Sequence, residues 1–84
     1  MTTPMQIRQR ILRVLEAYSP NSAPLPAIVD AVNVELPRKL APADVVAELS
    51  WLVDREMVAR VGEALDEDAR RWVITRLGLG ALQQ

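Results

Sequence analysis

The chain has 84 residues, of which half are hydrophobic and a quarter are charged, and this composition predicts a single folded domain over residues 1–84. It contains no cysteine and no histidine, which excludes disulfides, a Cys/His metal site and the commonest catalytic nucleophile and base. We therefore expect no enzyme, no cofactor and no metal. The formal net charge of −1 is not the positive excess that a dedicated nucleic-acid binder usually carries. No apolar run reaches the length of a membrane span and no signal-peptide pattern opens the chain, so we expect a cytoplasmic protein without a membrane partner.

The first predicted helix begins at Pro4, because Thr3 can cap it and Gln6 can complete a capping box. The apolar side chains of this helix recur at helical spacing on one face: Ile7, Ile11, Val14, Leu15 and Tyr18. The run 19–22, which contains proline, asparagine and two serines, then breaks the helix.

Prolines also mark the starts of the next two helices. Pro24 and Pro26 flank Leu25, which is expected to be extended. Pro26 then begins a second helix that ends near Val32. Residues 33–41 form a connecting loop, and Pro42 begins a third helix that reaches Asp54. The inner face of this third helix carries a set of aliphatic residues: Val45, Val46, Leu49, Leu52 and Val53.

Two strands and a short helix are predicted to complete the chain. Residues 57–61 and 70–75 are rich in β-formers, and the acidic run 62–69 joins them as a hairpin loop. Trp72 alternates with Ile74 and is expected in the core, while Thr75 is expected to cap the final helix. Three helices followed by a two-stranded wing and a short last helix are the plan of a winged helix-turn-helix domain, a mainly α fold with a β-hairpin.

Two segments resemble winged-helix transcription regulators. The run 48–58, ELSWLVDREMV, is similar to the exit of the recognition helix in ArsR- and MarR-type regulators, and the run 74–78, ITRLG, is similar to the end of their wing. The resemblance covers nearly the whole chain and points most directly to the small winged-helix proteins of Mu-like phages and prophages. Glu56 stands where such regulators usually carry glycine, so a left-handed backbone at this position would be costly.

The resemblance implies a DNA-associated regulatory or accessory factor that binds double-stranded DNA as a homodimer. Many helix-turn-helix proteins contact phosphate through the loop before the third helix, and others through the wing. The candidate DNA contacts are five basic residues and one serine: Arg38, Lys39, Ser50, Arg60, Arg70 and Arg71. Alternatively, Arg70 and Arg71 pair with the acidic hairpin loop.

A second apolar edge of the first helix, together with the last helix, supplies a candidate dimer interface. Its residues are Met5, Leu12, Leu79 and Leu82. Winged-helix regulators of the resembled type often dimerise through their first and last helices, which implies a two-fold homodimer here.

The outer face of the third helix leaves a different function open. Residues 42–54 carry three carboxylates and no base, whereas base readout normally uses Arg, Lys, Asn or Gln. An alternative is therefore a protein–protein interaction module whose acidic helix and wing have lost DNA readout. Its candidate partner contacts are Asp44, Ala47, Glu48, Trp51 and Asp54. In this alternative Trp51 anchors the partner, unless the wing hairpin covers its ring.

Overall fold

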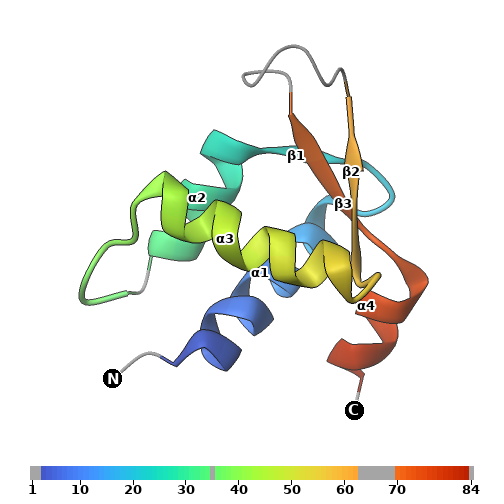
Figure 1. Ribbon diagram of the computed structural model, residues 1–84, viewed down its shortest axis with the longest axis horizontal. Coiled ribbons are helices and arrows are strands. Elements are labelled where there is room, and N and C mark those ends of the chain that lie inside the picture. Colours follow the sequence, from blue (N-terminus) through green and yellow to red (C-terminus); the bar gives the residue numbers. More distant parts are fainter. Residues whose placement is uncertain (1–2, 35, 63–69, 84) are drawn as a thin grey trace.

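The computed structural model describes residues 3–34, 36–62 and 70–83. The elements in chain order are α1 (Pro4–Tyr18), β1 (Ala23–Pro24), α2 (Leu25–Asn33), α3 (Pro42–Asp54), β2 (Val58–Val61), β3 (Arg71–Ile74) and α4 (Arg76–Leu82). In Figure 1, α1 lies behind α3, and the β2–β3 hairpin extends away from the end of the molecule where both chain termini lie. The winged-helix fold predicted from the sequence is confirmed, with element boundaries shifted by one or two residues.

The sheet has three strands, one more than the sequence predicted. Its order is β1-β3-β2 and all pairs are antiparallel. The additional strand β1 is two residues long, and its Ala23 pairs with Trp72 and is fully buried. The sequence predicted an extended residue only at Leu25, between Pro24 and Pro26, whereas Leu25 begins α2 and the strand precedes it. A strand of two residues is too short for an alternating pattern to stand out.

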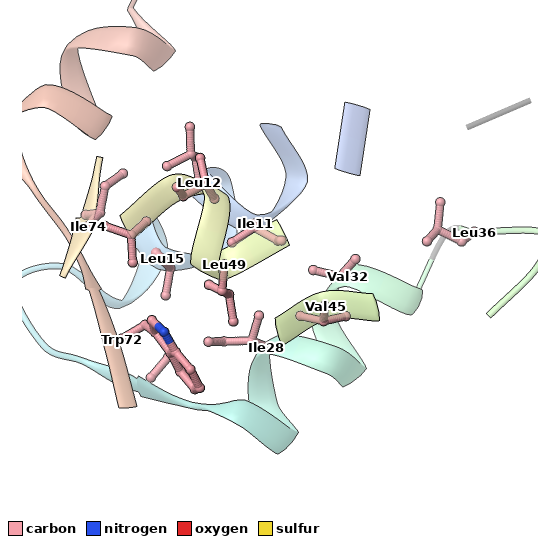
Figure 2. Packing of buried hydrophobic residues seen from close by; sticks show 13 residues of the cluster. Ile11, Leu12, Leu15, Ile28, Val32, Leu36, Val45, Leu49, Trp72 and Ile74 are labelled. Carbon is pink, nitrogen blue, oxygen red and sulfur yellow. The ribbon is translucent and has the colours of Figure 1, made fainter. Parts of the chain in front are cut away.

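Aliphatic side chains from α1, α2, α3 and β3 converge on one core (Figure 2). Trp72 and Ile74 belong to it, as predicted, and are 2% and 6% exposed. Two expectations for α1 were wrong. Leu12 is 4% exposed and packs in the core rather than on an outer edge, whereas Tyr18, at the end of the helix, is 38% exposed. The buried face of α1 is therefore rotated toward Leu12 relative to the predicted stripe.

The predicted helix starts are confirmed at both ends of the chain. The Thr3 hydroxyl accepts from the Gln6 backbone N–H, and the Gln6 side chain accepts from the Thr3 N–H, which completes the capping box of α1. The Thr75 hydroxyl accepts from the Gly78 N–H at 3.2 Å and caps α4. It also donates to the Glu56 carbonyl at 2.6 Å, which ties the start of α4 to the end of α3.

The exit of α3 contains a left-handed residue at the position where this chain has glutamate in place of the glycine of the resembled regulators. Glu56 has a φ of 63°. Its N–H donates to the Val53 carbonyl and the Met57 N–H donates to the Leu52 carbonyl, both at 3.0 Å, which is the Schellman pattern of a helix end. This bend turns the chain from α3 directly into β2.

Gly78 allows α4 to lie against that bend. A Cβ at this position would be 2.3 Å from the Met57 carbonyl oxygen and 2.7 Å from Cγ1 of Ile74. A side chain cannot be accommodated there, so glycine is needed for close packing rather than for an unusual backbone angle. Within the described ranges, no helix has both the length and the apolar character needed to cross a bilayer.

Candidate nucleic-acid interface

The loop between α2 and α3 is held by the side-chain amide of Asn33. Its Nδ2 donates to the Leu40 carbonyl at 3.1 Å, and its Oδ1 accepts from the Leu40 N–H at 2.8 Å. One side chain thus satisfies both backbone groups of a residue seven positions later. This clamp sets the separation of the two helices of the helix-turn-helix.

The two basic residues of this loop have different environments. The Lys39 ammonium donates to the Asn33 carbonyl and, at 3.2 Å, to the Leu36 carbonyl, so it caps the C-terminal end of α2. Arg38 is exposed and makes no hydrogen bond or ion pair with the described residues. Of the two predicted phosphate contacts, Arg38 is therefore the one without a partner in the described ranges, and Lys39 also caps α2.

The outer face of α3 is lined by small side chains and is less acidic than its sequence suggested. Ala43, Ala47, Ser50 and Asp54 are exposed and follow one another at helical spacing. Asp44 is also exposed, but its carboxylate accepts from the Ala41 N–H at 3.2 Å and caps the helix. Asp54 is thus the α3 carboxylate without a local partner among the described residues.

The third carboxylate of α3 is neutralised by a residue from α1. Glu48 Oε1 lies 3.4 Å from Nη2 of Arg8, and the two side chains are only 17% and 26% exposed. The same guanidinium is stacked 3.7 Å from the ring centroid of Trp51, and that of Arg55 lies 4.6 Å from the same centroid. Trp51 is therefore half-buried between two cations. The open anchor considered from the sequence does not describe this half-buried ring.

The basic residues of the hairpin also differ from one another. Arg71 donates from Nε to the Ser22 hydroxyl at 2.8 Å and from Nη2 to the Ser22 carbonyl at 3.0 Å, so it fixes the segment that leads into β1. Arg70 lies over the Trp72 ring at 5.8 Å. Arg60 is exposed on β2, opposite Trp72 in the register. The acidic loop that we considered as a partner for these arginines includes residues 63–69, which lie outside the described ones.

The residues predicted for a dimer interface differ in how much of their surface is exposed. Met5 is 67% exposed near the start of α1. Leu79 and Leu82 of α4 are half-buried and pack against the core. Leu12 is inside that core, so it offers no area to a second copy. Sequence reasoning also overlooked Leu77, which is 59% exposed on α4.

Arg8 is the site residue whose importance the sequence did not reveal. It lies 40 positions before Glu48 and only its place on α1 brings the two together. No local pattern marks such a pair, because neither residue helps to define the helix that carries the other. The described residues include no group of three or more carboxylates placed to hold a metal ion.

No protein-family model matches the sequence, and no curated protein is similar to it. Solved structures do match. BpsR of Bordetella bronchiseptica, studied for the regulation of its DNA binding by 6-hydroxynicotinic acid, has a TM-score of 0.73 and 17% identity over 92% of this chain and 52% of its own. A mutant of S. aureus MepR has a TM-score of 0.71 and 17% identity over 90% of this chain and 51% of its own.

ZitR of Lactococcus lactis, a zinc-responsive MarR family member, has a TM-score of 0.69 and 21% identity over 92% of this chain and 47% of its own. This chain thus spans about half the length of the solved structures it matches. BpsR is described as a protein whose DNA binding is regulated, and ZitR as a MarR family member that responds to zinc. These likenesses show that the chain has the winged-helix fold of MarR-type regulators.

Proposed function

We propose that this chain is a DNA-associated regulatory or accessory factor that binds double-stranded DNA mainly through the phosphate backbone. The observation that carries the proposal is the outer stripe of α3. Ala43, Ala47 and Ser50 place small side chains along it, and of the three α3 carboxylates Glu48 is paired with Arg8. Asp44 accepts one backbone N–H and Asp54 stays exposed. A helix with such a surface can approach a duplex closely, with less repulsion than three open carboxylates would cause.

The same surface predicts weak sequence discrimination. Ala43 and Ala47 can make only apolar contacts with base edges, and Ser50 can bond to several bases. Phosphate contacts would come from exposed arginines on either side in the sequence, Arg38 before α3 and Arg60 after it. The fold shared with BpsR, whose DNA binding is regulated, supports this function.

Fluorescence anisotropy with a labelled random-sequence duplex tests the proposal. We expect binding at low salt that falls steeply as the salt concentration rises, because each neutralised phosphate releases counterions. The variant Arg38→Ala should weaken binding to all sequences alike and lower the salt slope by about 1, with unfolding unchanged. No binding at low salt would contradict the proposal.

Lys39→Ala is the matched control, because it removes an equal charge one residue away. Its ammonium caps α2, so the variant should lose about 0.5–1 kcal/mol of stability. Its effect on the salt slope should be smaller than that of Arg38→Ala. Equal slopes for the two variants would show that net charge, rather than the position of Arg38, governs binding.

The structure gives less support to the alternative of an acidic docking module. Trp51, its proposed anchor, is covered by Arg8 and Arg55, and Glu48 is paired. Asp44, Asp54 and the small residues of the stripe remain exposed on α3. Two results together would restore this alternative. The protein would bind a basic protein but no DNA, and Trp51→Ala would abolish the binding of that protein.

We also propose that the protein acts in the cytoplasm as a two-fold homodimer and is phage-borne. Met5 of α1 and Leu77 of α4 are exposed apolar residues on two helices that pack together at the end of the molecule nearest the termini (Figure 1). Leu79 and Leu82 would contribute only their exposed edges. A sedimentation coefficient of a monomer at all concentrations would exclude the dimer, and the neighbouring genes would test the phage origin.

A further inference from the structure

We infer that Arg8 is a positioning residue of the DNA interface: it neutralises Glu48 and clamps Trp51, and so keeps an unpaired carboxylate away from a duplex lying on α3. The inference rests on the proposed DNA binding. It assigns a role in that binding to a residue of α1, a helix that does not belong to the helix-turn-helix.

The guanidinium of Arg8 is already engaged by two side chains of α3. The guanidinium is 3.4 Å from the Glu48 carboxylate and 3.7 Å from the centroid of Trp51. Its Nε is buried without a hydrogen-bond partner, a cost that an exposed arginine would avoid by turning toward water. The guanidinium is therefore held by the aromatic face and the carboxylate together, and not by a full set of hydrogen bonds.

Glu48 is placed where an unpaired charge would affect DNA. It follows Ala47 of the exposed stripe and so lies about 100° around α3 from it, on the flank that meets Arg8 of α1. A duplex resting on the stripe would bring phosphates within roughly one Debye length, about 8 Å, of that flank. Without Arg8, the half-buried Glu48 would lack a partner and would turn toward solvent, where its charge would act on those phosphates.

Trp51 explains why an arginine suits this position. A planar guanidinium can stack on the ring and face a carboxylate at the same time, whereas an ammonium acts as a point charge. Arg55 lies over the same ring at 4.6 Å, near the C-terminal end of α3, where the helix dipole favours a cation. Arg8, Arg55 and Glu48 together thus leave one net positive charge around Trp51. Removal of the Arg8 charge brings this sum to zero, and removal of the Glu48 charge as well brings it back to one positive charge.

The experiment is a double-mutant cycle with Arg8→Met, Glu48→Gln and both together, measured by duplex anisotropy at low salt. Methionine keeps apolar packing on Trp51, so the fold should survive, which circular dichroism checks. We expect Arg8→Met to weaken binding about threefold to tenfold, from repulsion by one charge at 5–8 Å across a partly wet surface. The double variant should return to within about twofold of the wild type, while Arg8→Lys should fall between wild type and Arg8→Met.

Unchanged binding by Arg8→Met, or a double variant as weak as Arg8→Met, would overturn the inference. If the wild-type protein does not bind DNA, the proposed function is refuted, and a second measurement still tests the role of Arg8. Trp72 is only 2% exposed, so quenching of fluorescence by iodide reports on Trp51. The ratio of iodide to acrylamide quenching should fall in Arg8→Met and recover in the double variant. An unchanged ratio in Arg8→Met would overturn the inference independently of DNA.

Discussion

The two ends of α3 are fixed in place by different kinds of contact. At the N-terminal end, polar side chains bind backbone groups a few residues away: Asn33 binds Leu40, and Asp44 binds Ala41. At the C-terminal end, the contacts come from distant parts of the chain. Arg8 reaches Trp51 from α1, and α4 approaches the Met57 carbonyl through Gly78.

This difference matters for a helix that is to meet DNA. The entry to α3 depends on local hydrogen bonds, so its geometry is set by the loop itself. The exit depends on how α1 and α4 pack, so a change in either helix would tilt α3 from that end. Contacts that span the chain form only when the whole domain folds, and their loss should therefore cost more than the loss of a local clamp.

The largest effect is expected from Gly78→Ala, which breaks the packing at the exit. The added Cβ would lie 2.3 Å from the Met57 carbonyl oxygen, so backbone would have to move. We expect a loss of about 3 kcal/mol in the free energy of unfolding, measured by urea denaturation. The matched control is Gly80→Ala, since a Cβ there meets nothing within 4 Å. The control should gain up to about 1 kcal/mol from helix propensity, and an equal loss in both variants would refute the account of Gly78.

A smaller loss is expected from Asn33→Ala, which breaks the clamp at the entry. Both backbone groups of Leu40 would lose their partner in a partly buried site. We expect a loss of about 1–2 kcal/mol in the free energy of unfolding by the same denaturation assay. Asn33→Asp keeps the acceptor for the Leu40 N–H and should lose less. A loss larger than that of Gly78→Ala would reverse the order proposed for the two ends.

The smallest effect, a gain, is expected from Glu56→Gly at the exit. Glycine adopts the φ of 63° at no steric cost, whereas glutamate must be held there by its surroundings. We expect the free energy of unfolding to rise by about 0.5–1 kcal/mol, seen as a higher midpoint of thermal unfolding. Glu56→Ala removes the same charge but keeps a Cβ, and should bring no such gain. A gain in both variants would assign the effect to charge instead of backbone strain.

The helices, the two wing strands and several single residues could be read from the sequence because each is marked by neighbours in the chain. The capping box of Thr3 and the cap at Thr75 are both local patterns. Strand β1 could not be read, since only pairing with Trp72 makes Ala23 part of a sheet. The place of Leu12 was missed for a related reason: helical spacing gives a face, but the packing of α2, α3 and α4 decides how that face is turned.

For the candidate site, the sequence determined which charges α3 carries and that arginines lie on either side of it. Only the tertiary structure decided which charges remain open to a partner. Glu48 is paired with a residue 40 positions away, Lys39 caps α2 and Arg71 binds Ser22, while Arg38 and Arg60 have no hydrogen bond or ion pair among the described residues. An electrostatic surface is a sum over groups close in space, and the chain order of residues says little about which groups those are.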